Sequence, residues 1–122
     1  MQLILGGARS GKSRLAEQIA QQLAQPVVYV ATAQALDGEM QARIQHHQQQ
    51  RPEDWGLCEE PIYLAAQLVK LDRPNQTILV DCLTLWMSNL LMHADPDLQV
   101  QECQKLLDVL GNLQSELILV SN

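Results

Sequence analysis

The chain has 122 residues, enough for one hydrophobic core and too few for two, so the sequence predicts a single domain over residues 1–122. Apolar residues make up 47% of the chain and charged residues 18%, a globular composition that excludes a disordered protein. The formal net charge of -6, without a cluster of Lys or Arg, argues against nucleic acid as a partner.

The three cysteines, Cys58, Cys82 and Cys103, fit neither a disulfide framework nor a zinc site, because they are widely spaced and form no C-x-x-C pair. The N-terminal residues lack the basic leader and apolar core of a signal peptide, and no apolar run approaches membrane-spanning length. We therefore expect a cytoplasmic protein without a membrane span.

The first third of the chain predicts a strand, a helix and a second strand. Residues 3–5 are a short apolar run stopped by two glycines, and the β-branched run of residues 27–30 follows Pro26. The helix between them begins at Lys12 and repeats an apolar residue every four positions. Its expected packing face is Leu15, Ile19 and Leu23 with Ala16 and Ala20, and its expected solvent face is Glu17, Gln18, Gln21 and Gln22.

Helices and strands continue to alternate through the rest of the chain. The expected elements are helices over residues 37–50, 61–71, 85–93 and 103–113, strands over residues 77–81 and 117–120, and a turn at residues 94–97. This alternation predicts an α/β fold with a mainly parallel sheet that is covered on both faces. In such a fold we expect ligands at the carboxyl ends of the strands.

The segment between the first strand and the first helix has the phosphate-binding pattern G-x-x-x-x-G-K-S. It consists of Gly6, Gly7, Ala8, Arg9, Ser10, Gly11, Lys12 and Ser13. The backbone N–H groups of such a loop bind phosphate at a helix N-terminus, Lys12 is expected at the terminal phosphates, and Ser13 at a magnesium ion. A chance match is the alternative. The sequence thus predicts binding of a nucleoside triphosphate with Mg2+.

Asp81 ends an apolar strand and is the second candidate ligand of Mg2+, directly or through water. The alternative is that Asp81 only caps the helix that follows.

Two adjacent histidines, His46 and His47, lie on the helix expected over residues 37–50. They are a poor metal pair because neighbouring helical residues do not face each other. At about 100° per residue, His47 lies on the side of Met40 and Ile44, and His46 lies on the outer side. We therefore expect His47 to face the body of the protein, so His47 is the candidate if either histidine acts near the nucleotide. The alternative, which the residues alone favour, is a partly buried histidine without a catalytic role.

Six segments carry a family resemblance. They are residues 6–13, 29–33 (YVATA), 40–52 (MQARIQHHQQQRP), 55–61 (WGLCEEP), 80–91 (VDCLTLWMSNLL) and 119–122 (LVSN). Together they resemble the bifunctional adenosylcobinamide kinase / adenosylcobinamide-phosphate guanylyltransferase family of cobalamin biosynthesis. The phosphate loop is common to many NTPases, whereas the histidine segment and the D-C-L-T-L-W stretch are more particular. The resemblance implies a P-loop NTPase fold, RecA-like, with three α/β/α layers.

The resemblance also implies two reactions. The first phosphorylates the aminopropanol hydroxyl of adenosylcobinamide with ATP or GTP, and the second transfers GMP from GTP to adenosylcobinamide phosphate through a guanylylated histidine. The family pattern maps this histidine to His47, with His46 as the alternative. ATP, GTP, Mg2+ and the corrinoid are the implied ligands, and a homotrimer is the implied assembly.

By the same resemblance, further residues are expected to contact the nucleotide. They are Ala31, Thr32, Ala33, Gln48, Gln49, Gln50, Arg51 and Glu59. An ordinary loop is the alternative, and Arg51 has the clearest use because a guanidinium binds phosphate well. Trp55, Trp86 and Leu90 are expected in the core rather than at the ligand.

The family continues beyond Asn122 with a Glu-Val-Gly segment, further strands and a helix. The resemblance therefore implies a P-loop domain whose C-terminal strands are missing. Two alternative functions are a P-loop kinase that acts on another small alcohol and a non-catalytic nucleotide-binding fragment.

Overall fold

Five strands form one sheet in the part of the chain that the computed structural model describes, residues 1–5, 11–33 and 54–121. The strands are β1 (Gln2–Leu5), β2 (Val27–Ala31), β3 (Gly56–Glu59), β4 (Thr77–Asp81) and β5 (Glu116–Ser121). Their order is β1-β5-β4-β2-β3, and every neighbouring pair is parallel. The expected parallel α/β sheet is confirmed.

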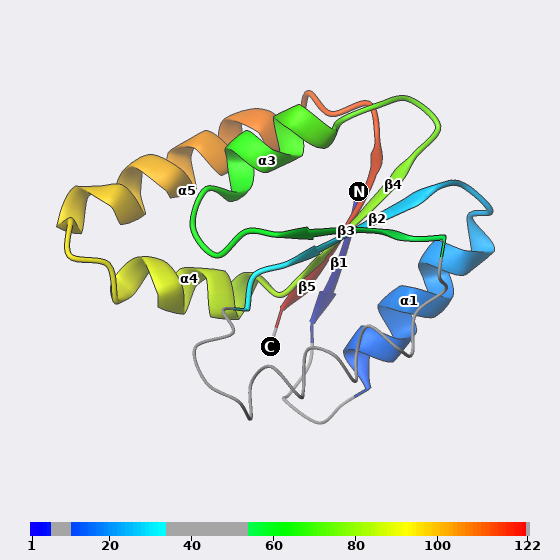
Figure 1. The fold of residues 1–122 in the computed structure, drawn as a ribbon, viewed down its shortest axis with the longest axis horizontal. Helices are drawn as coiled ribbons and strands as arrows, with labels where there is room; N and C mark the ends of the chain where they lie inside the picture. Colours follow the sequence, from blue (N-terminus) through cyan, green and yellow to red (C-terminus); the bar gives the residue numbers. More distant parts are fainter. Residues whose placement is uncertain (6–10, 34–53, 122) are drawn as a thin grey trace.

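The helices cover both faces of this sheet (Figure 1). On one face lies α1 (Lys12–Gln22), and on the other lie α3 (Leu64–Leu71), α4 (Leu83–Leu91) and α5 (Pro96–Leu110). This is the expected three-layer α/β/α arrangement. None of these helices is long and apolar enough to cross a membrane. The helix expected over residues 37–50 lies outside the described residues.

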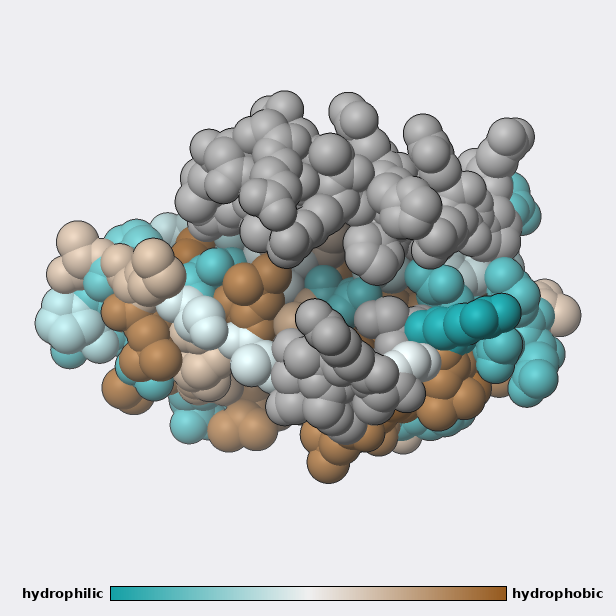
Figure 2. All heavy atoms as spheres, turned by 90° about the horizontal axis from the view of Figure 1, so that it is seen from below, coloured by the Kyte–Doolittle hydropathy of each residue, from teal (hydrophilic) through white to brown (hydrophobic). Residues whose placement is uncertain are grey.

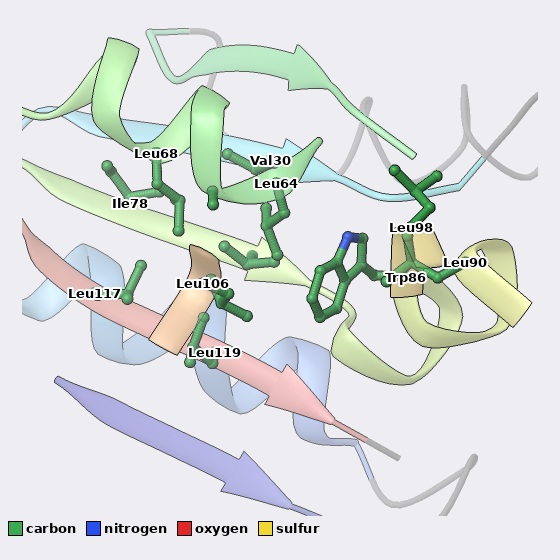
Figure 3. Close-up of a cluster of buried hydrophobic side chains, with 12 residues drawn as sticks. Val30, Leu64, Leu68, Ile78, Trp86, Leu90, Leu98, Leu106, Leu117 and Leu119 are labelled. Atoms are coloured by element: carbon green, nitrogen blue, oxygen red, sulfur yellow. The ribbon is translucent and has the colours of Figure 1, made fainter. Parts of the chain in front are cut away.

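Side chains of each strand alternate between the two faces of the sheet. On β4, Ile78 and Val80 enter the core cluster beneath α3, α4 and α5, whereas Leu79 enters the cluster beneath α1. Figure 3 shows the first of these clusters, with Leu64 of α3 over the sheet and Trp86 of α4 beside it. The position of a residue along its strand therefore decides which layer of helices it meets.

The packing face of α1 differs from the expected one. Ala16 and Ala20 are fully buried, whereas Leu15 is 48% exposed. Placing Leu15 in the core was wrong because the two alanines, with no bulk beyond Cβ, let the helix approach the sheet and occupy the centre of its inner face. Figure 2 shows hydrophilic side chains over this helix, at the right. The expected solvent face is confirmed for Gln18, Gln21 and Gln22.

The start and the buried stripe of α5 also differ from the expected ones. The turn expected at residues 94–97 contains the start of the helix, because Pro96 is its first residue and the Asp95 carboxylate accepts the backbone N–H two residues on at 3.0 Å. The apolar pattern of the helix expected over residues 103–113 placed both Leu106 and Leu107 on its packing face. Leu106 is buried as expected, whereas Leu107 is 65% exposed, and the buried residues of α5 are Leu98, Glu102 and Leu106. The earlier start lengthens the helix, and its buried residues follow a spacing of four from Leu98.

The sequence did not predict β3. Its four residues include a glycine and no β-branched side chain, and Leu57 is exposed, so the local pattern carries no strand signal. The strand is stabilised by its pairing with β2 at the edge of the sheet. Two helix starts also shift, since α3 begins at Leu64 rather than Pro61 and α4 begins at Leu83 rather than Leu85.

Candidate functional site

The carboxyl ends of the strands form one edge of the sheet, and the described candidate residues lie there. Ala31, the last residue of β2, is paired in register with Glu59 at the end of β3 and with Asp81 at the end of β4. Thr32 and Ala33 continue the chain from β2. Five candidate residues from three distant segments are thereby neighbours at the edge where a parallel sheet binds its ligands.

The amino end of α1 lies at the same edge, because the chain reaches α1 from the carboxyl end of β1. Gly11 precedes the helix with a φ of 76°, a left-handed conformation that glycine adopts without steric cost. A Cβ on Gly11 would meet nothing within 4 Å, so the backbone angle and not crowding favours glycine. A helix start of this kind supplies backbone N–H groups that suit phosphate. The remaining candidates, Gly6, Gly7, Ala8, Arg9, Ser10, His46, His47, Gln48, Gln49, Gln50 and Arg51, lie outside the described residues.

Asp81 has its side chain on the α1 face of the sheet. The alternation along β4 requires this, since Leu79 packs with the α1 cluster and Val80 with the opposite one. The hydroxyl of Tyr29, on the neighbouring strand β2, donates a hydrogen bond of 2.5 Å to Oδ2 of Asp81. Tyr29 is only 5% exposed. The carboxylate is thus held on the face where α1 begins with Lys12.

The alternative role for Asp81, as the cap of the following helix, is not what the structure has. The N-cap of α4 is Cys82, whose Sγ accepts the backbone N–H of Leu85 at 3.4 Å. Cys82 takes the cap because it is the residue in extended conformation immediately before the first helical turn. The Asp81 carboxylate is directed to Tyr29 instead.

Asp81 also fits the Mg2+ of a nucleotide. In residues 1–5, 11–33 and 54–121, no three His, Cys, Asp or Glu side chains form a group that holds a metal by themselves. A magnesium ion shared with phosphates takes only one or two protein carboxylates and keeps water in its other positions. A single carboxylate at the carboxyl edge is therefore a suitable donor for this ion.

Thr32 is fully buried and its polar groups are engaged within the protein. Its hydroxyl donates to the carbonyl oxygen of Cys82 at 2.8 Å and accepts the N–H of Cys82 at 3.0 Å. Its backbone N–H donates to the carbonyl oxygen of Asp81 at 3.2 Å. Thr32 therefore fixes the backbone of Asp81 and Cys82, and its hydroxyl is turned inward and away from a ligand at the surface.

Two side chains of α4, neither of them proposed for the site from the sequence, join the segments of this edge. Nδ2 of Asn89 donates to the carbonyl oxygens of Thr32 at 2.8 Å and of Pro61 at 3.1 Å. Nε1 of Trp86 donates to the carbonyl oxygen of Ile62 at 2.7 Å. A polar Asn89 within the apolar run of α4 was the available sequence signal. The expected core positions are confirmed for Trp86 and Leu90, and Trp55 packs half-buried against the α1 cluster.

The two glutamates after β3 have different roles. Glu60 accepts the backbone N–H groups of Ile62 at 3.1 Å and Tyr63 at 3.0 Å, and its other oxygen accepts Nε2 of Gln67 at 3.3 Å. It thereby stabilises the turn that leads into α3. Glu59 is exposed at the end of the edge strand. Of the two, Glu59 is the one that faces solvent at this edge.

The comparisons with known proteins agree with this geometry. The family model for cobinamide kinase / cobinamide phosphate guanyltransferase matches residues 2–122. The chain belongs to this family. A member of the family from Pseudomonas aeruginosa, the bifunctional adenosylcobalamin biosynthesis protein CobP, is 53% identical over 120 residues, which are 98% of this chain and 69% of that protein.

Two further members of the family carry the name bifunctional adenosylcobalamin biosynthesis protein CobU. The Escherichia coli protein is 47% identical over 102 residues, which cover 80% of this chain and 55% of that protein. The Salmonella typhimurium protein is 46% identical over 91 residues, which cover 75% of this chain and 50% of that protein. The resemblance found in the sequence is confirmed, and the chain spans between 50% and 69% of the length of these relatives.

Proposed function

We propose that this protein phosphorylates adenosylcobinamide and then transfers GMP from GTP to adenosylcobinamide phosphate, which gives adenosylcobinamide-GDP. The observation that carries the proposal is the Asp81 carboxylate on the α1 face, beside the strand ends that bear Ala31 and Glu59, in a chain matched by the family over residues 2–122. An acidic residue at a strand end and a helix that starts from a phosphate loop are the parts that a P-loop kinase needs.

In the kinase reaction, the phosphate loop of residues 6–13 binds the β- and γ-phosphates of ATP or GTP. The corrinoid hydroxyl oxygen forms a bond to the γ-phosphorus, the bond to the nucleoside diphosphate breaks, and the hydroxyl proton is released. Lys12 offsets negative charge on the terminal phosphates, and Ser13 and Asp81 are the residues that hold Mg2+. When bound, Mg2+ neutralises charge that develops on the transferred group.

In the guanylyl transfer, a neutral imidazole nitrogen of His47 forms a bond to the α-phosphorus of GTP and pyrophosphate leaves. An oxygen of adenosylcobinamide phosphate then attacks the same phosphorus, and the histidine is released. His46 is the alternative nucleophile. The nucleotide contacts that we propose are Ala31, Ala33, Gln48, Gln49, Gln50, Arg51 and Glu59, and the exposure of Glu59 at the carboxyl edge supports its inclusion. Thr32, which the resemblance places among them, is fully buried with its hydroxyl bonded to Cys82, so we propose that it supports the site without a side-chain contact to the nucleotide.

The same proposal includes a cytoplasmic location and a homo-oligomer, the trimer that the family resemblance implies.

The decisive experiment is a search for the covalent intermediate. The protein is incubated with α-labelled GTP and Mg2+, and the peptide that contains His46 and His47 is analysed by mass spectrometry for an acid-labile, base-stable GMP adduct. The adduct is expected in the wild type and in His46→Ala, and its loss is expected in His47→Ala and Lys12→Ala. His93→Ala is the matched control, since His93 is the third histidine of the chain and is an exposed residue just after the C-cap of α4.

Each other outcome points to a different function. An adduct that persists in His47→Ala and disappears in His46→Ala assigns the nucleophile to His46. Phosphorylation of cobinamide without an adduct indicates a kinase alone. Binding of GTP without either reaction indicates a nucleotide-binding chain without catalysis and contradicts the proposal.

A further inference from the structure

Tyr29 is a buried tyrosine whose hydroxyl group is directed at the candidate site. The residue is 5% exposed and lies in the core cluster on the α1 face, together with Ala16 and Ala20 of that helix. A core position that makes no hydrogen bond would suit Phe equally well, whereas the hydroxyl of a buried Tyr needs a hydrogen-bond partner. Tyr29 has one in the Asp81 carboxylate, at 2.5 Å.

The backbone of Asp81 is fixed from both sides. Asp81 is paired in register with Ala31 of β2 and with Val120 of β5, and its carbonyl oxygen accepts the N–H of Thr32 at 3.2 Å. With its backbone fixed, Asp81 can still change the torsion angles of its side chain. Because the terminal torsion of an aspartate is broad, packing of the backbone does not determine where its two oxygens point.

The phenol of Tyr29 supplies that restraint. Its ring is held by the surrounding core, so the hydroxyl is a fixed donor that engages Oδ2 of Asp81. A hydrogen bond to an ionised acceptor is stronger than one between neutral groups. Hydrogen bonds to ligating carboxylates of this kind orient metal ligands, and their removal weakens metal binding by about ten- to a hundredfold.

We propose that Tyr29 is a positioning residue, whose hydroxyl holds the Asp81 carboxylate in the orientation in which it binds the Mg2+ of the bound nucleotide. This inference rests on the proposed function, because it requires that the protein bind a nucleotide with a divalent cation. It predicts that loss of the Tyr29 hydroxyl weakens binding of the divalent cation and leaves the metal-free affinity for nucleotide unchanged.

The test measures binding and not turnover. Mn2+ is used as the probe, and its affinity for the protein with GTP is read from the loss of the electron paramagnetic resonance signal of free Mn2+ beyond the loss that the same concentration of GTP causes without protein. Affinity for a fluorescent GTP analogue in EDTA gives the metal-free reference. For Tyr29→Phe, we expect Mn2+ to bind about tenfold more weakly, with the metal-free affinity for nucleotide unchanged.

Two variants separate positioning from a structural role. Tyr63→Phe is the matched control, because the chain has only two tyrosines and Tyr63 is 48% exposed on the opposite side of the sheet, before α3. Its Mn2+ affinity is expected to equal that of the wild type. In the Asp81→Asn background, Tyr29→Phe is expected to cause no further loss, since its effect passes through the carboxylate.

The outcomes distinguish this inference from the proposed function. A wild type that binds neither GTP nor Mn2+ with GTP contradicts both. A wild type that binds Mn2+ with GTP, and a Tyr29→Phe variant that binds it equally well, overturns the role of Tyr29 alone. If Tyr29→Phe weakens metal-free nucleotide binding as much as Mn2+ binding, or folds less well by circular dichroism with the same loss of both, Tyr29 is structural and the inference is wrong.

Discussion

The Thr32 hydroxyl donates to the Cys82 carbonyl oxygen at 2.8 Å and accepts the Cys82 backbone N–H at 3.0 Å. These two hydrogen bonds join the chain just after β2 to the chain just after β4, beyond the last pair of the strand ladder, Ala31 and Asp81. Both residues are buried, so neither bond can be replaced by bulk water without opening the structure. The position of Asp81 depends on this junction.

Thr32→Val tests this junction. Valine has the shape of threonine without the hydroxyl, so the buried N–H of Cys82 loses its hydrogen bond to that hydroxyl. The Cys82 carbonyl oxygen loses one of its hydrogen bonds and still accepts the N–H of Trp86 at 3.2 Å. We expect the free energy of unfolding to fall by about 1–3 kcal/mol, the cost of removing the acceptor of a buried N–H group. Urea denaturation followed by circular dichroism measures it. Thr32→Ser is the control, because it keeps the hydroxyl and loses one methyl group. Equal losses in the two variants would show that the hydroxyl is not responsible.

Asp72 gives the stability of the protein a dependence on pH. The backbone N–H of Gln114 lowers the pKa of Asp72 most, burial opposes this, and the N–H of Ser115 lowers the pKa further. The distances from these N–H groups to the carboxylate are 2.8 Å to 3.0 Å. Because the folded pKa lies below the unfolded value, the carboxylate stabilises the folded state above the unfolded pKa, and this contribution is lost as the pH falls through the folded pKa.

We therefore expect Asp72→Asn to be less stable than the wild type near neutral pH and the difference to shrink below about pH 4. Urea titrations at several pH values between about 7 and about 3 measure this difference. Asp108→Asn is a suitable comparison, since Asp108 is an exposed carboxylate on α5 and the substitution makes the same change in net charge. A difference between Asp72→Asn and wild type that stays constant over this range would contradict the role given to Asp72.

The inner face of α1 yields a prediction about volume. Ala20 is fully buried against the sheet and Leu15 is 48% exposed, so the two positions should respond in opposite ways to a change of size. Ala20→Leu adds three carbon atoms to a packed contact and is expected to cost about 1–3 kcal/mol of unfolding free energy. Leu15→Ala is expected to cost less than about 1 kcal/mol. Thermal denaturation of both variants measures these losses. A greater loss of unfolding free energy for Leu15→Ala than for Ala20→Leu would indicate that Leu15 packs in the core, as predicted from the sequence.

The sequence was sufficient for the strands and helices with strong local patterns. Residues 27–30 and 77–80 are continuous runs of apolar, aromatic or β-branched residues, because a parallel strand buried on both faces favours such side chains, and these runs are visible without a structure. The four residues of β3 were missed since an edge strand needs no such run. Its conformation comes from hydrogen bonds to β2, which a local pattern does not contain.

The sequence predicted which residue at a strand end could bind the ligand, but not which residues hold that residue in place. Asp81 was found because it ends an apolar strand, a feature of the sequence itself. Tyr29 and Asn89 were not, because their roles depend on contacts across 52 and 57 residues of chain. Thr32 was expected at the nucleotide by resemblance, and its two bonds to Cys82 could be recognised only once β2 and β4 were seen side by side.

The place of β1 in the sheet has a consequence for synthesis. Gln2 pairs with Ile118 and Leu5 with Ser121, and α1 packs on β4 and β5. The segment that leads into the phosphate loop therefore leaves the ribosome long before its neighbours in the sheet, residues 118–121. The chain between β1 and β5 must close into a long loop before the contacts between these strands can stabilise the fold, and this closure slows folding. A nascent chain that has not yet released residues 116–121 from the ribosome lacks the support for its nucleotide site, so nucleotide can stabilise this domain only after these residues have emerged.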